Sequence, residues 1–311
     1  MSESIIKKPC LFRGAASALV TPFRNGKIDF EAFGRLIEWQ IAGKIDALVV
    51  CGTTGESATL SDDEHLSLIT FAVEKTAGRV PVIAGTGSND TAHAVFMSKE
   101  ACARGADGLL VVTPYYNKTT PAGLCESFLK IADASTKPIL LYNVPSRTGM
   151  TIPLSAYRVL AEHEKIVGTK EASGDIGLIA ELIAELGGKL AVYSGNDDLT
   201  LPILSLGGAG VISVVSNLLP ETVSRLCRLT REGEYLSAAE IQLSLVDLIR
   251  ALFLEPNPIP VKAALTMMGK IDGEIRLPLT ALGESHRKTL TEALIHHGLL
   301  PPEKIPSSDL A

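Results

Sequence analysis

The sequence predicts a closed (β/α)8 TIM barrel followed by a C-terminal appendage of three helices. Eight short apolar runs recur at intervals of roughly 20–35 residues, with helical periodicity between most of them, which is the spacing of βα units. Several runs are apolar throughout, as parallel strands covered on both faces should be. The predicted strands are Ala15–Val20, Ala47–Cys51, Val80–Ala84, Gly108–Val112, Pro138–Tyr142, Ile166–Lys170, Leu190–Ser194 and Gly210–Val215. No Gly-x-Gly-x-x-Gly follows the first run, which argues against an open dinucleotide-binding sheet.

Composition excludes several classes of protein. Charged residues make up 21% of the 311 residues, and the net charge is −6. The sequence contains no long run of charges of either sign. This pattern argues against nucleic-acid binding and against a polybasic membrane anchor. No stretch approaches the roughly 18 apolar residues of a spanning helix. The region after Lys7 faintly resembles a signal peptide, but Pro9 and Arg13 interrupt its apolar run. The five widely spaced cysteines predict reduced core thiols and a cytoplasmic protein.

After about Glu232 the strand pattern stops and helices are predicted. An apolar stripe indicates one helix over residues 235–254. Two prolines open a second helix that runs through Met268, and a third spans residues 285–297 before a glycine. Three helices are too few for a large separate core. We therefore divide the chain into a barrel, residues 1–233, which carries the active site, and a helical region, residues 234–311, packed on it.

The sixth predicted strand delivers Lys170 to its C-terminal end, just before a Ser-Gly-Asp turn. Burial disfavours the ammonium form of a lysine, and a partly desolvated amine can attack a carbonyl to form a Schiff base. Side chains alternate along a strand, so Glu171 is not expected to pair with Lys170. Gly168 lies on the lysine's face and is expected to leave room for a small substrate. The alternative is a lysine that reaches solvent from a strand end.

Small and polar residues follow the predicted strands. In a barrel all eight of these loops open onto one face, where such enzymes carry out their chemistry. The predicted mouth collects Thr53, Thr54, Tyr115, Tyr116, Tyr142, Arg147 and Lys170.

Three of these loop segments suggest chemistry. The backbone N–H groups and hydroxyls of GTTGES, residues 52–57, are suited to hold a carboxylate. Tyr142 can relay a proton, and Arg147 can bind a carboxylate through two hydrogen bonds. Each feature alone also fits a structural role, as a helix cap, a core tyrosine or a surface arginine. Together with Lys170 they favour Schiff-base chemistry on a small 2-oxo acid.

The sequence predicts no cofactor and no metal in this chemistry. GTGSND, residues 85–90, lacks the Gly-Lys-Ser/Thr of a phosphate loop. GNDD, residues 195–198, places two carboxylates side by side with no histidine near in sequence, so a solvated loop is expected there. The six histidines show no H-x-x-x-H spacing, which argues against a metal-dependent aldolase.

Six motifs, in order and spacing, closely resemble the dihydrodipicolinate synthase family of the pyruvate-dependent class I aldolase superfamily, which also contains N-acetylneuraminate lyase. The motifs are GTTGESATL, TPYYNK, YNVPSRTG, GTKEASGD, GGAGVISV and EPNPIPVK. The resemblance covers residues 14–300. It implies a barrel, usually in a homotetramer built as a dimer of dimers, that condenses pyruvate with aspartate 4-semialdehyde on the route to diaminopimelate and lysine.

The resemblance also implies catalytic roles for four residues. Lys170 would form the imine with pyruvate, and Tyr142 would shuttle protons. Thr53 would link Tyr142 to Tyr116, which members of the family contribute from the neighbouring subunit.

Four further residues would line the pocket. Thr54 would hold the pyruvate carboxylate, and Arg147 would receive the carboxylate of the semialdehyde. Gly195 and the backbone carbonyl of Ile212 would lie beside Lys170.

A regulatory site is a further expectation from the resemblance. The residues that match the lysine-inhibited members are Ser57, Ala58, His65, Asn89 and Tyr115. Asp62 and His93, however, stand where a histidine and a glutamate are expected. Weak or absent inhibition by lysine is therefore expected.

Two other functions remain open on the sequence. One is a related aldolase acting on N-acetylneuraminate or a 2-keto-3-deoxy sugar acid, although an arginine after YNVPS and GTT instead of GST favour the synthase. The other is a binding protein without catalysis, which the presence of every expected catalytic side chain disfavours.

Overall fold

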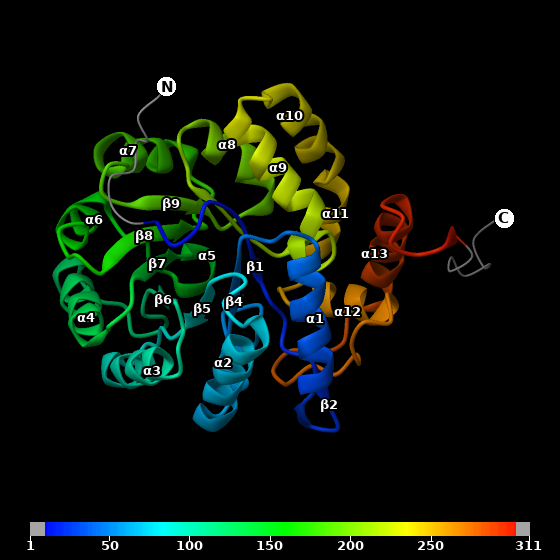
Figure 1. Cartoon of the computed structure of the whole chain (residues 1–311), viewed down its shortest axis with the longest axis horizontal. Coiled ribbons are helices and arrows are strands. Elements are labelled where there is room, and N and C mark those ends of the chain that lie inside the picture. The colour runs from blue at the N-terminus through cyan, green and yellow to red at the C-terminus, as the bar shows by residue number, and fades with distance from the viewer. Residues whose placement is uncertain (1–9, 303–311) are drawn as a thin grey trace.

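The computed structural model describes residues 10–302, and its centre is a closed barrel of eight parallel strands (Figure 1). Each strand pairs with the next along the chain, and β1 closes the ring against the last strand. The predicted fold class is confirmed, and the strand boundaries lie within two residues of the predicted ones. The barrel strands are β1 (Gly14–Ala18), β4 (Ala47–Val50), β5 (Val82–Gly85), β6 (Gly108–Val112), β7 (Ile139–Asn143), β8 (Ile166–Glu171), β9 (Ala191–Ser194) and β10 (Gly210–Ser213).

Helices follow the strands and surround the barrel (Figure 1). The sequence did not predict a small hairpin of β2 (Phe23–Arg24) and β3 (Lys27–Ile28) that precedes the first helix. The helices of the ring are α1 (Phe30–Ala42), α2 (Asp62–Thr76), α3 (Thr91–Ala103), α4 (Pro121–Ala134), α5 (Pro145–Thr148), α6 (Leu154–Leu160), α7 (Ile176–Leu186), α8 (Thr200–Ser205) and α9 (Pro220–Glu232). Three short 3₁₀ turns lie in the loops: η1 (Ser57–Thr59), η2 (Asp197–Leu199) and η3 (Val215–Asn217).

Local sequence explains where these helices begin. Ser61 caps α2 by accepting from the backbone N–H of Glu64, whose side chain accepts in return from the N–H of Ser61, a capping box. Asp90 and Thr120 cap α3 and α4 through their side-chain oxygens, which accept from backbone N–H groups of the first turn. The loops that carry the polar motifs are therefore fixed at their far ends by capped helices.

Two apolar cores hold the fold together. The larger one lies between the strands and the helical ring, and a smaller one fills the barrel interior. In the interior, Phe12 stacks on Tyr193 with ring centroids 4.4 Å apart. Because side chains fill the interior of a barrel of this size, ligands are restricted to the loops at the strand ends.

The C-terminal region consists of α10 (Tyr235–Ser244), α11 (Val246–Leu252), α12 (Ile259–Met267) and α13 (Glu284–His296). The single helix predicted over residues 235–254 is two helices that meet at Leu245. α10 contacts α9, and α13 contacts α11 and α12 at the edge of the molecule (Figure 1). The division of the chain at residue 233 stays a prediction.

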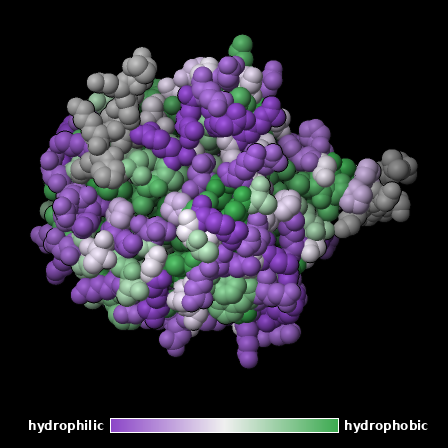
Figure 2. Space-filling model, in the orientation of Figure 1, coloured by the Kyte–Doolittle hydropathy of each residue, from purple (hydrophilic) through white to green (hydrophobic). Residues whose placement is uncertain are grey.

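The outer surface is mixed. On the face shown in Figure 2, hydrophilic residues are interspersed with smaller hydrophobic areas. None of the helices between residues 10 and 302 is long and apolar enough to cross a membrane. The signal-peptide comparison involved Lys7 and Pro9, which lie outside the described residues.

Candidate active site

Lys170 lies in β8 directly beside Tyr142 in β7. The strand register pairs these two residues, and both side chains are buried. The Nζ atom of Lys170 lies 4.4 Å from the centroid of the Tyr142 ring. Parallel strands in register therefore bring together the amine and the phenol that were predicted from two separate motifs.

Glu171 points away from Lys170, as strand alternation predicts. Its carboxylate accepts hydrogen bonds from the Tyr157 hydroxyl at 2.6 Å and from the Asn143 amide and the Ser173 hydroxyl, both at 2.8 Å. Burial raises the pKa of Glu171, and these donors oppose the shift. The neighbouring carboxylate thus belongs to a separate structural network outside the barrel interior.

Gly168 does not leave room for a substrate, although the sequence predicted that it would. A Cβ atom on this residue would lie 2.5 Å from the carbonyl oxygen of Ala191 and 3.0 Å from Leu140. Glycine is needed there because β8 packs closely on its neighbours, so the vacant space is not available to a substrate.

Gly195, by contrast, directly affects the lysine. A Cβ atom there would lie 2.7 Å from Ala172 and 3.1 Å from the Cε atom of Lys170. A glycine after β9 therefore leaves the space that the lysine side chain occupies.

A cavity of about 340 Å³ opens above Lys170. Six predicted residues line it: Thr53, Thr54, Tyr142, Arg147, Lys170 and Gly195. Parallel strands and their loops thus gather most of the predicted site at one mouth.

The C-terminal helices complete this cavity, which the sequence did not predict. Ile249, Arg250 and Phe253, in and just after α11, line it together with Asn257. The Asn257 amide donates to the Thr54 hydroxyl at 2.9 Å, and its backbone carbonyl accepts from Arg147 at 2.9 Å. Asn257 lies in the motif EPNPIPVK, residues 255–262, but from the sequence this motif indicated only a break between two helices.

Asn257 also has an unpartnered acceptor. Its side chain is 6% exposed, and its Oδ1 atom has no hydrogen-bond partner among residues 10–302. A buried polar atom without a partner is uncommon in native proteins. Asn257 lines the cavity, but this Oδ1 atom is itself shielded from solvent.

The expectation of a solvated GNDD loop is wrong for Asp197. This residue is 6% exposed and accepts from the Ser213 hydroxyl at 2.5 Å and from the backbone N–H of Val214 at 2.9 Å. Burial raises its pKa, while these bonds and the charge of Lys170 oppose the shift. Asp197 thereby ties the loops after β9 and β10 together at the cavity wall.

Two predicted residues lie apart from the cavity in the single chain. Tyr116 is 95% exposed and has a φ angle of +71°. Ile212 is fully buried in β10, and the cavity is instead lined by Val214, two residues further on. Positive φ is uncommon for a residue other than glycine, so the exposed conformation of Tyr116 is held at a cost.

A second cavity, of about 470 Å³, adjoins the first and shares Thr53 and Arg147 with it. Four of the predicted regulatory residues line it: Ser57, Ala58, His65 and Tyr115. The fifth, Asn89, donates through its amide to the backbone carbonyl of Tyr115 at 3.1 Å. Four of the five predicted regulatory residues thus line one cavity, and the fifth is hydrogen-bonded to one of them.

The two departures from the lysine-inhibited pattern contact each other. His93 lines the second cavity, and its Nε2 atom lies 3.0 Å from a carboxylate oxygen of Asp62. His65, in the same cavity, has its Nε2 atom 2.7 Å from the carbonyl oxygen of Gly85, and burial lowers its pKa. The Asp62 carboxylate and the His93 imidazole therefore pair with each other.

The GTTGES loop is fixed from beneath by a buried ion pair. Lys262 in α12 donates to Glu56 at 2.5 Å, and both side chains are almost fully buried. The backbone N–H of Arg276 donates to the other carboxylate oxygen of Glu56 at 3.1 Å. Burial lowers the pKa of Lys262, and the charge of Glu56 opposes this. This pair, which the sequence did not predict, anchors the loop that carries Thr53 and Thr54.

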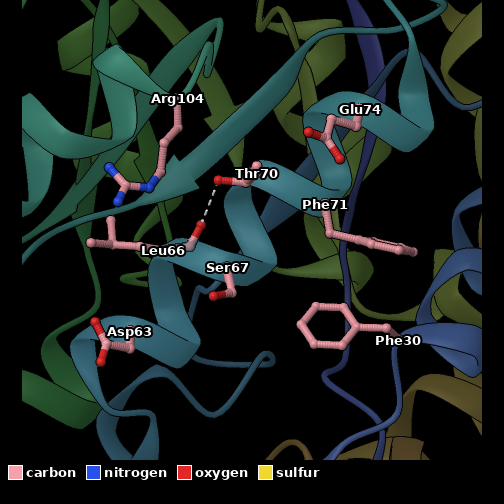
Figure 3. A pocket seen from close by; sticks show the side chains of 8 residues that line it. All are labelled: Phe30, Asp63, Leu66, Ser67, Thr70, Phe71, Glu74 and Arg104. Carbon is pink, nitrogen blue, oxygen red and sulfur yellow. Dashed lines mark hydrogen bonds between the residues drawn. The ribbon is translucent and has the colours of Figure 1, made fainter.

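A third cavity, of about 480 Å³, lies outside the barrel against α2 (Figure 3). Phe30 and Arg104 reach it from neighbouring segments, and none of the predicted site residues lines it. The catalytic expectation therefore rests on the first cavity.

The fold and the first cavity define a (β/α)8 barrel with a buried lysine and tyrosine at its mouth. Residues 11–297 match the Dihydrodipicolinate synthetase family. The chain belongs to this family, as its motifs predicted.

Individual relatives agree over almost the whole chain. The 4-hydroxy-tetrahydrodipicolinate synthase of Caldicellulosiruptor bescii is 51% identical over 290 residues, which are 93% of this chain and 98% of that protein. Two solved structures cover 93% of this chain and 99% of theirs. One is the chloride-inhibited dihydrodipicolinate synthase of Acinetobacter baumannii in complex with pyruvate, with 42% identity and a TM-score of 0.91. The other is the enzyme of Cyanidioschyzon merolae with lysine bound, with 40% identity and a TM-score of 0.90.

Proposed function

We propose that the chain is a 4-hydroxy-tetrahydrodipicolinate synthase, a lyase of lysine biosynthesis, and that it works through a Schiff base at Lys170. The observation that carries the residue assignment is the position of the Lys170 amine over the Tyr142 ring at the base of the cavity. The related aldolases are disfavoured, because close relatives over the whole chain are synthases.

The reaction begins with pyruvate. The neutral amine of Lys170 attacks the C2 carbonyl, and loss of water gives an imine. Removal of a proton from the methyl carbon gives an enamine, whose carbon attacks the aldehyde of aspartate 4-semialdehyde. The amino group of the bound semialdehyde portion then attacks the imine carbon, which closes the ring and breaks the bond to Lys170, so the free amine is regenerated. Tyr142, whose ring centroid lies 4.4 Å from the Lys170 nitrogen, carries protons in these steps, and Thr53 relays them.

Two carboxylates have to be held during this condensation. Thr54 is assigned to pyruvate, because it lies at the cavity and its hydroxyl is fixed by Asn257. Arg147 is assigned to the semialdehyde, because it lines both cavities near the entrance. An arginine suits a planar carboxylate, which accepts two parallel hydrogen bonds.

The active unit is a homotetramer built as a dimer of dimers. The exposed, positive-φ conformation of Tyr116 supports this assembly, because an aromatic side chain held in solvent has a purpose if it enters a neighbouring subunit. We place the enzyme in the cytoplasm, in keeping with its five free cysteines.

Feedback inhibition by lysine is weak or absent. Position 93, where the expected pattern has an acidic residue, is a histidine in this chain. The Asp62 carboxylate pairs with that histidine. The α-ammonium group of a bound lysine consequently lacks its expected partner. Strong inhibition by submillimolar lysine in a steady-state assay contradicts this assignment.

The function is tested by supplying pyruvate and aspartate 4-semialdehyde in a coupled assay. Turnover is expected, whereas no pyruvate release is expected from N-acetylneuraminate or 2-keto-3-deoxygluconate. Release of pyruvate from a sugar acid without turnover of the semialdehyde would favour the related lyases instead.

A further inference from the structure

A cluster of two histidines and one carboxylate lies on the C-terminal helices, away from the catalytic cavity. Asp247 is in the first turn of α11, His296 is the last residue of α13, and His297 follows it. One ligand atom from each lies within 4.8 Å of the others, and no other trio of this kind is found between residues 10 and 302. The fold thus joins residues that lie about 50 positions apart in the sequence.

The side chains converge on one point. The Nδ1 atom of His296 lies 2.7 Å from one oxygen of Asp247, and the Nε2 atom of His297 lies 2.8 Å from the other. The two imidazole centroids are 5.1 Å apart, with the rings at 63°. Two imidazoles that bind one tetrahedral ion have centres about 5 Å apart, because metal–nitrogen distances are about 2.0–2.1 Å. The separation of the rings therefore matches that of two ligands of one ion, and the ion would replace the hydrogen bonds to Asp247.

The cluster is exposed to solvent on the side of His296 and buried on the side of His297. The His296 side chain is 72% exposed, whereas that of His297 is 11% exposed. An ion can enter from solvent and find one ligand already fixed by packing. Residues at both helix ends are held, since α11 and α13 contact each other.

We propose that Asp247, His296 and His297 form a binding site for a divalent transition-metal ion of the Zn²⁺ type. Two imidazole nitrogens and one carboxylate oxygen are a ligand set that suits Zn²⁺ or Co²⁺. They suit Mg²⁺ and Ca²⁺ less well, because these ions prefer oxygen ligands throughout. A water molecule takes the fourth position of the tetrahedron. The imidazoles bind in their neutral form, so binding releases protons and weakens as the pH falls.

The ion has a structural consequence. It ties the first turn of α11 to the end of α13, and α11 carries Ile249 and Arg250 at the wall of the catalytic cavity. The ion is not part of the proposed Schiff-base chemistry, because no catalytic side chain belongs to the cluster. Its effect is to stabilise the packing of α13 on α11 within the helical region.

The site is tested with untagged protein by calorimetric titration of Zn²⁺ and by the visible absorption of Co²⁺. We expect one ion per chain, a Co²⁺ spectrum typical of tetrahedral coordination, and a thermal midpoint raised by Zn²⁺. His296→Ala should weaken binding at least tenfold and abolish the Co²⁺ spectrum. Because His296 is exposed, this variant should keep the thermal midpoint of the metal-free protein.

His286→Ala is the matched control. His286 also pairs with a carboxylate, that of Glu255 at 2.8 Å, but no second histidine joins this pair among residues 10–302. Metal binding should be unchanged in this variant. Absence of a one-to-one heat and of the Co²⁺ spectrum in the wild type would overturn the proposal. Equal affinity in His296→Ala and the wild type would do the same.

Discussion

Two buried lysines between residues 10 and 302 lie over aromatic rings at the same distance, but they differ in their other contacts. Lys170 Nζ is 4.4 Å from the Tyr142 ring, and Lys262 Nζ is 4.4 Å from the Phe23 ring. Lys262 has a carboxylate partner in Glu56, whereas no carboxylate lies within salt-bridge distance of Lys170 in residues 10–302.

This difference shows that burial alone does not make a lysine reactive. At Lys262 the ion pair retains the ammonium form, and the ring beneath has no polar group. At Lys170 a phenol replaces the plain ring and the cavity lies open above it. The same aromatic contact therefore serves structure at one position and, in our proposal, proton transfer at the other.

Tyr142→Phe makes the surroundings of Lys170 resemble those of Lys262. We expect kcat to fall by about 10²–10⁴-fold, the usual contribution of a positioned proton donor or acceptor. Steady-state assay with both substrates measures this. Unchanged kcat with a normal thermal midpoint would remove Tyr142 from proton transfer.

Lys262→Met should affect stability rather than chemistry. Removing one partner of a buried ion pair costs about 3–5 kcal/mol, because the other charge is left without compensation. Urea unfolding should show this loss, and adding Glu56→Gln should restore much of it. A single variant as stable as the wild type would show that the pair is not structural.

Arg147→Ala tests the entrance of the cavity. Loss of charge-assisted hydrogen bonds to a carboxylate costs about 1.5–3 kcal/mol, which is roughly 10–100-fold in kcat/KM for the semialdehyde. Borohydride trapping with pyruvate alone should be unaffected. Normal turnover of the semialdehyde would contradict the role given to Arg147.

Glu64→Gln tests the ion pair between Glu64 and Arg276 through the pH dependence of stability. The backbone of the same arginine also donates to Glu56, the partner of Lys262. Arg276 donates two hydrogen bonds to Glu64, at 2.7 and 2.6 Å, and these lower the pKa of Glu64 from 4.5 to about 2. A lowered carboxyl pKa contributes stability above about pH 4.5 that is lost as the pH falls toward 2.

The variant should therefore be about 1–2 kcal/mol less stable than the wild type at pH 6, and the difference should vanish near pH 2. Unfolding at a series of pH values measures this. Glu31→Gln, which removes an exposed pair with Arg35, is the control and should show almost no difference. A difference for Glu64→Gln that is the same at every pH would contradict the assignment.

The barrel and most of its mouth could be predicted because their signals are local. Strand runs are short and apolar, and parallel strands deliver their C-terminal residues to one edge. Lys170 and Tyr142 lie at predicted strand ends and Arg147 lies in the segment after one of them, so their meeting follows from the fold.

Contacts between distant segments could not be predicted. Asn257 reaches Thr54 from 203 positions away, and Lys262 reaches Glu56 from 206. Asp197 was misjudged because its donors lie on the next strand and loop, beyond the reach of local polarity. The reason for the glycine at position 168 could not be predicted either. The space beside this glycine is filled by Ala191 and Leu140 of the neighbouring strands, and a single sequence does not show which residues pack there.

The central claim is that Lys170, and not Lys262, forms the imine. The most direct measurement is intact mass after incubation with pyruvate and borohydride, followed by peptide mapping, for the wild type, Lys170→Ala and Lys262→Met. We expect one pyruvate-derived adduct on Lys170 in the wild type, none in Lys170→Ala, and an adduct on the folded fraction of Lys262→Met. An adduct that maps to Lys262, or no adduct on the wild type, would contradict the account.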